Sequence, residues 1–182
     1  MPVKRRNIGP ADPSDHRGLV DELAGELASP HPFGQPMIDE DVFTRTGLLG
    51  VTVIWDRWQG IADNQRTGII LAAYETSRGI EEKNRISFAV GNTVDEAIEA
   101  GRLPILLVPH LRKSDRMTLA QLRAAMKQVG GAYKEDGDFP AVLYFPSQED
   151  AEAGIQKLIE VLPESTEIWG IASESARPSW AN

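Results

Sequence analysis

The chain has 182 residues, of which 41% are hydrophobic and 25% charged, a composition typical of a globular protein. It has no cysteine, which excludes disulfides, thiolate metal sites and cysteine nucleophiles. Its net charge of −8 disfavours nucleic-acid binding, since nucleic-acid binders usually present a basic surface. No apolar run reaches the roughly 18 residues of a membrane span, and the basic start lacks the apolar core of a signal peptide. We therefore expect a soluble, cytoplasmic protein without membrane contact.

Residues 1–47 are predicted to form an extended arm, a short helix and a proline-rich connector. The helix is expected from Ser14 to about Ala28, because apolar residues recur there on one helical face; they are Leu19, Val20, Leu23 and Leu27. The connector contains isolated apolar residues, including Phe33 and Phe43. These side chains either bind a partner or pack on the protein's own core, and the second alternative is the commoner one.

Residues 48–172 are predicted to form a single α/β domain. Runs of β-branched and aromatic residues indicate about five strands, at 51–55, 86–90, 103–110, 141–145 and 167–171. Helical spacing and capping residues indicate helices between them, at 63–77, 93–100, 118–129 and 147–162. Strands that alternate with helices favour a layered α/β or α+β fold. The tail, 173–182, is expected to be flexible and to expose Trp180.

The stretch from Val142 to Ile155 resembles the strand-to-helix passage of ferredoxin-like and RNA-recognition domains. The resemblance extends over 103–172 and implies a ferredoxin-like topology there. RNA-recognition domains stack bases on aromatic side chains of two adjacent strands. In the alignment that fits best, those positions hold Leu107, Pro140 and Val142, which cannot stack a base. RNA binding is therefore the least favoured of the functions considered.

The apolar run 103–110 ends in a charged turn that contains His110, Arg112, Lys113 and Arg116. Ligands of open α/β sheets tend to bind beyond the carboxyl ends of strands, and arginine suits phosphate and carboxylate groups. One hypothesis is therefore a site for a small anion or nucleotide. The alternative is a solvated loop, which the missing glycine-rich cradle favours.

Other patterns give little support for catalysis. The three histidines are far apart in sequence, so no metal-ligand spacing is present, and no cofactor is predicted. Trp58 follows the first strand and is expected to cap the end of the sheet, or to anchor a partner as exposed tryptophans do. The sequence thus favours a non-enzymatic interaction module, with Phe33, Phe43, Trp58 and Trp180 as contact residues and a protein partner or a second copy as the ligand.

Overall fold

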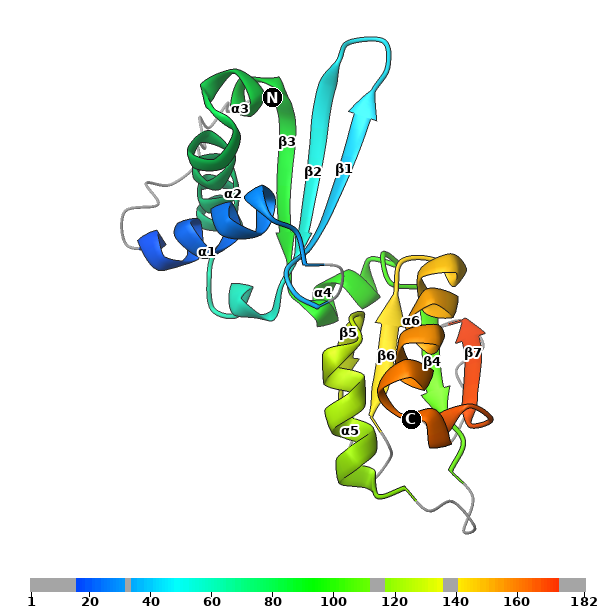
Figure 1. Ribbon diagram of the computed structural model, residues 1–182. Helices are drawn as coiled ribbons and strands as arrows, with labels where there is room; N and C mark the ends of the chain where they lie inside the picture. Colours follow the sequence, from blue (N-terminus) through cyan, green and yellow to red (C-terminus); the bar gives the residue numbers. More distant parts are fainter. Residues whose placement is uncertain (1–15, 32–33, 112–116, 136–140, 174–182) are drawn as a thin grey trace, which may run out of the picture. The chain divides into compact units, whose positions relative to one another are not determined.

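The computed structural model describes residues 16–31, 34–111, 117–135 and 141–173. The chain divides into two compact units (Figure 1). The first contains residues up to 31 together with 38–93, and the second contains 32–37 and the chain from 94 onward. The predicted mixed α/β architecture is confirmed. The stretch 48–172, expected as a single domain, is distributed over both units, which separate after Thr93.

The first unit contains a three-stranded sheet with the order β1-β2-β3. Its strands are β1 (Met37–Phe43), β2 (Leu48–Ile54) and β3 (Ile86–Asn92). Strands β2 and β3 run parallel, and the chain passes between them through the 3-10 helix η2 (Asp56–Trp58), helix α2 (Asp63–Arg78) and helix α3 (Ile80–Arg85). Strand β1 lies where an irregular connector was expected, and helix α3 was not predicted either.

Helices α1 (Arg17–Ala28) and α2 supply the helical side of the first core (Figure 1). The apolar stripe predicted for α1 is buried there. The strands contribute β-branched side chains, Val51 and Val53 among them, from the face of the sheet that α2 covers. The helices and β2 therefore share one core. Because side chains alternate along a strand, the residues of β1 and β3 that do not point into this core lie on the opposite face of the sheet.

The second unit contains a four-stranded sheet with the order β5-β6-β4-β7. All three strand pairs are antiparallel. In chain order the elements are α4 (Val94–Glu99), β4 (Ile105–Pro109), α5 (Leu119–Gln128), β5 (Ala132–Lys134), β6 (Val142–Phe145), α6 (Gln148–Val161), the 3-10 helix η3 (Pro163–Ser165) and β7 (Trp169–Ser173). From β4 onward this is the βαββαβ order of ferredoxin-like domains, so the topology that the resemblance implied is confirmed.

The predicted caps of α5 and α6 are also present. The Thr118 hydroxyl accepts a hydrogen bond from the Gln121 N–H over 3.2 Å, and the Gln121 side chain accepts one from the Thr118 N–H over 2.9 Å. Ser147 caps α6 through the N–H of Asp150, at 3.1 Å. Because these caps involve residues three apart, the sequence alone specifies them.

Helices α5 and α6 pack on one face of the second sheet. The residues on that face show that one position in the alignment with RNA-recognition domains was wrong. Leu107 belongs to the core beneath the helices, so it does not point to the opposite face, which is the one on which RNA-recognition domains stack bases. On β4 the residue that faces away from the helices is the neighbouring Leu106, which is paired with Tyr144. On β6 the predicted position, Val142, does lie on that face together with Tyr144, because it alternates with Leu143 of the core. Tyr144 is 1% exposed and thus offers no stacking surface to a base.

Candidate functional site

Of the four residues predicted to bind an anion, the structure describes one. His110 is exposed at the end of β4, and its N–H donates a hydrogen bond to the Ile168 carbonyl over 2.7 Å. Its imidazole lies against Gly170, where an added Cβ would be 2.9 Å from the ring carbon Cδ2. Arg112, Lys113 and Arg116 lie outside the described residues. The anion site therefore stays a prediction.

Trp58, predicted as a contact residue, is fully buried in the first core. Its Nε1–H donates to the Val53 carbonyl over 3.0 Å, and its ring meets the Trp55 ring edge-on at 5.1 Å. Arg66, also buried, donates to the carbonyl of Gly91 over 3.0 Å. Trp58 thus closes the sheet end as a structural residue, and the expectation that it meets a partner is corrected, because no part of the side chain reaches the surface.

Phe43 is accessible, whereas Phe33 and Trp180 lie outside the described residues. Phe43 is 44% exposed at the end of β1, and Phe88 of β3 is 40% exposed beside it. The two ring centroids are 6.0 Å apart with the planes tilted by 58°. This separation is typical of interacting aromatic pairs. Two phenylalanines that are 45 residues apart in sequence thus form one exposed apolar surface.

Gly50 of β2 provides the space that Phe88 occupies. Residues Gly50 and Phe88 are partners in the parallel pairing of β2 and β3. A Cβ at Gly50 would lie 2.6 Å from Cε1 of the Phe88 ring, so any larger residue would displace the ring. The glycine leaves room for the Phe88 ring over β2, from where the ring contacts Phe43.

Alternation along β1 places two acidic residues on the same face as Phe43. Ile38 packs toward the helical core and Glu40 contacts α2, which leaves Asp39 and Asp41 on the opposite face. Both aspartates are exposed. Neither has a hydrogen bond or ion pair through its side chain with another described residue. We call Asp39, Asp41, Phe43 and Phe88 the hairpin patch.

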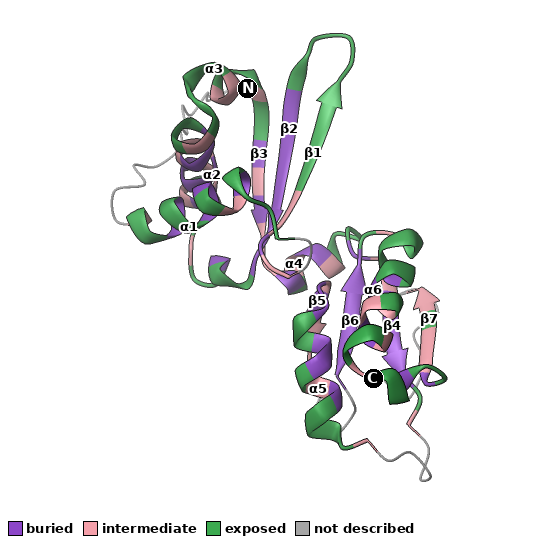
Figure 2. Cartoon of the chain, viewed as in Figure 1, coloured by how far each residue is buried: buried purple, intermediate pink, exposed green. Residues whose placement is uncertain are grey.

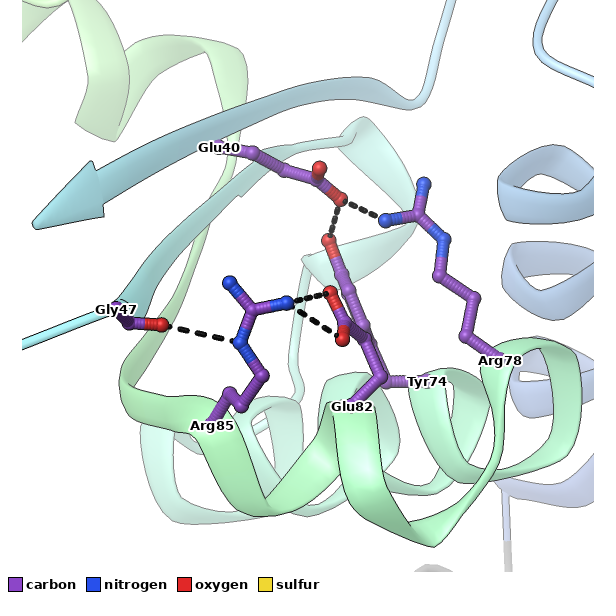
Figure 3. A network of polar contacts seen from close by, with 6 residues as sticks. All are labelled: Glu40, Gly47, Tyr74, Arg78, Glu82 and Arg85. Atoms are coloured by element: carbon purple, nitrogen blue, oxygen red, sulfur yellow. Dashed lines mark hydrogen bonds and ion pairs between the residues drawn. The ribbon is translucent and has the colours of Figure 1, made fainter. Parts of the chain in front are cut away.

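A polar network fixes β1 to the helices from the other side of the sheet (Figure 3). The buried Tyr74 hydroxyl of α2 donates to the Glu40 carboxylate. Arg78, one turn further along α2, donates to the same Glu40 oxygen over 2.8 Å. Burial, followed by the hydrogen bond to Glu40, raises the pKa of Tyr74 well above its ordinary value. The phenol therefore stays neutral and remains a donor over the whole physiological pH range.

The turn between β1 and β2 is fixed as well. The Phe43 carbonyl accepts hydrogen bonds from the N–H groups of Thr46 and Gly47, at 3.0 and 2.8 Å. Gly47 has a positive φ of 67°, which fits the left-handed last residue of a four-residue hairpin loop built around a type I turn. Arg85 of α3 donates to the Gly47 carbonyl over 3.0 Å and pairs with Glu82 (Figure 3). The hairpin that carries the patch is thus held at both its middle and its tip.

Among the strands that the structure describes, β1 is also an edge of its sheet. Every residue from Asp39 to Phe43 is exposed, whereas β2 is buried over almost its whole length (Figure 2). An edge strand leaves alternate N–H and carbonyl groups without a partner strand. Sequence reasoning named Phe43 but missed β1, Phe88 and the two aspartates. The signal that was available is the turn 44–47, which ends in glycine and separates two segments with apolar residues.

No comparison with known proteins assigns the chain to a family: no protein-family model, curated protein or solved structure matched it. Within the described ranges, no three histidine or acidic side chains gather where they would hold a metal ion. None of the helices in that part of the chain has both the length and the apolar character to cross a bilayer.

Proposed function

We propose that the protein is a non-enzymatic interaction module that binds a partner protein through the hairpin patch. The observation that carries the proposal is the exposed pair of Phe43, on the β1–β2 hairpin whose position is fixed, and Phe88, on the neighbouring strand β3. Aromatic side chains are enriched at the centres of protein interfaces, because they bury a large apolar area with few torsions to restrict. Here the network of Tyr74, Arg78 and Arg85 already restricts the backbone, so binding costs less conformational entropy.

The charge of the hairpin favours a different protein over a second copy of this chain. Residues 37–54 contain three acidic residues and one basic residue, Arg45. Antiparallel pairing of two β1 strands centred on Glu40 would place Asp39 of one copy opposite Asp41 of the other. Like charges directly opposite each other destabilise a strand pair. A partner with basic residues at this position would instead gain charge complementarity.

The proposal is tested in two ways. A lysate of the native cells is passed over the immobilised full chain to see which proteins it retains, and the mass of the purified chain in solution is measured by light scattering. The variant Phe43→Ser/Phe88→Ser removes the apolar part of the patch. A matched control, Leu119→Ser/Val161→Ser, removes two similarly exposed apolar side chains from the second unit, where Leu119 is 47% and Val161 44% exposed. We expect the wild type and the control to retain the same partner, and the patch variant to lose it.

Two results would contradict this function. Retention that is equal for the patch variant and the wild type would show that the partner binds elsewhere. A dimer in light scattering that becomes a monomer in Phe43→Ser/Phe88→Ser would show that the patch binds a second copy. Circular dichroism and a thermal melt of both variants verify that the fold is kept, as expected for exposed positions.

A further inference from the structure

We propose that the partner supplies an extended basic segment, which pairs with the outer edge of β1 and adds a fourth strand to the first sheet. This inference rests on the proposed function and specifies the chemistry of the partner. It has three supports, which are the outer edge of β1, along which no described strand is paired, the spacing of Asp39 and Asp41, and the position of the aromatic pair beside them.

The first support is that the residues of β1 disfavour pairing with an acidic or identical strand but not with a basic one. Natural edge strands avoid pairing by means of proline, lysine, bulges or a covering segment. The seven residues of β1, MIDEDVF, contain neither proline nor lysine. Their protective residues are three acids, which repel an acidic or identical strand and attract a basic one. The edge is therefore selective for a basic strand, whose charges would be attracted by the acids while its backbone pairs with the N–H and carbonyl groups of β1.

The second support is the arrangement of the acids along the strand. Asp39 and Asp41 are two residues apart, so their side chains lie on one face at a spacing of about 6.6 Å. An added strand has the same repeat, so its alternate residues would lie beside the two aspartates. Arginine at these positions would bind each carboxylate with two parallel N–H donors. Glu40 takes no part, since Tyr74 and Arg78 already engage it on the other face.

The third support is the aromatic pair at the turn end of the same face. Phe43 lies two residues beyond Asp41 and contacts Phe88. The next alternate residue of an added strand would therefore meet an aromatic surface. An apolar side chain would bury area there, and a guanidinium would lie against a ring with the Asp41 carboxylate nearby, an arrangement that favours cations. We thus expect a segment with basic residues at alternate positions that ends in an apolar or arginine residue.

The test uses a fluorescent seven-residue peptide, the length of β1, with arginine at alternate positions, threonine between them and a terminal valine. Binding to the full chain is measured by fluorescence anisotropy. Two further peptides have the same sequence but are N-methylated at every second amide, one in each phase. Methylation keeps the side chains and charges and removes the N–H donors of one strand edge, so it separates strand addition from simple charge attraction.

Two protein variants separate the patch from overall charge. Asp39→Asn/Asp41→Asn removes both carboxylates of the patch. The control, Glu164→Gln/Glu167→Gln, removes two exposed carboxylates of the second unit and so changes the net charge equally. Exposed ion pairs are modest, so we expect the patch variant to weaken the binding of the unmodified peptide roughly three- to tenfold. The control is expected to leave it within about twofold.

The expected result is that the unmodified peptide binds, that at least one methylated peptide does not, and that only the patch variant weakens binding. The inference is overturned if the unmodified peptide does not bind, if both methylated peptides bind as well as it does, or if both variants weaken binding equally. None of these results contradicts the proposed function. That function fails if partner retention does not depend on Phe43 and Phe88, or if the patch binds a second copy of the chain. The two proposals can therefore fail separately.

Discussion

The Tyr74→Phe substitution tests whether β1 is held by the buried phenol. It removes one oxygen and leaves the ring, so the packing of α2 against the sheet is kept. The Glu40 carboxylate loses one donor and keeps Arg78, at 2.8 Å. The substitution therefore isolates the hydrogen bond between Tyr74 and Glu40 from the rest of the network.

The size of the effect follows from the charge and the exposure of the acceptor. Hydrogen bonds to charged groups contribute about 1.5–3 kcal/mol. The Glu40 side chain is 30% exposed, so water replaces part of the lost bond and the lower end applies. We expect the free energy of unfolding to fall by about 1–1.5 kcal/mol at about pH 8.

The pH dependence of this difference provides a sharper test. The pKa of Tyr74 is raised in the folded protein, whereas an unfolded tyrosine ionises at about 10. The stabilisation is therefore fully present below about pH 10 and is lost as the pH rises toward the folded value. At about pH 11, ionisation of Tyr74 in the unfolded state lowers the free energy of unfolding of the wild type by about 1.4 kcal/mol. The Tyr74→Phe variant has no phenol at this position and does not lose this amount. The two proteins should then be nearly equal in stability.

Urea unfolding of both proteins between about pH 8 and pH 11, followed by circular dichroism, measures this convergence. Lysines and the other tyrosines titrate in both proteins and cancel in the difference. A difference that stays constant over this range would refute the reasoning, because Tyr74 would then ionise alike in the folded and unfolded states. No difference at about pH 8 would show that the bond to Glu40 contributes nothing.

Three further outcomes follow from local geometry. Gly91→Ala should destabilise the protein by roughly 1–3 kcal/mol, because the new Cβ would lie 3.0 Å from the buried Trp58 ring; a neutral result in urea unfolding would contradict this. Gly25→Ala, in helix α1 with open space around the new Cβ, should stabilise it by about 0.5–1 kcal/mol, and a loss of stability would count against the helix. Tyr133→Phe should raise the pKa of Glu135, which the hydrogen bond from Tyr133 holds below its ordinary value; an unchanged NMR titration of Glu135 would exclude that cause.

Much of the second unit was predictable because its signals are local. The ends of α5 and α6 follow from Thr118 and Ser147, whose caps involve residues three positions away. Strand β6, Val142–Phe145, is an apolar run with one β-branched and two aromatic residues, which suits a buried strand. Once four strands and two helices are placed in this order, few topologies remain, and the ferredoxin-like one is among the simplest.

The hairpin patch was not predictable in this way. Asp39, Glu40 and Asp41 disfavour a strand by local propensity. Strand β1 forms because β2 offers it a partner, and because Tyr74 donates a hydrogen bond to Glu40 while Arg78 pairs with its charge. Phe43 and Phe88 meet only because the chain returns beside β2 after α2 and α3. No pattern within a short window contains that contact.

The sequence by itself therefore determined the fold class, most of the helices and strands, and the absence of cysteine chemistry, since each depends on composition or on residues a few positions apart. The tertiary structure decided which side chains are buried and which meet. It placed Trp58 in the core, turned Leu107 toward the helices, and brought two phenylalanines and two aspartates onto one face of the first sheet. The physical reason is that burial and side-chain contact depend on strand pairing and register, and one residue of register exchanges the two faces of a strand.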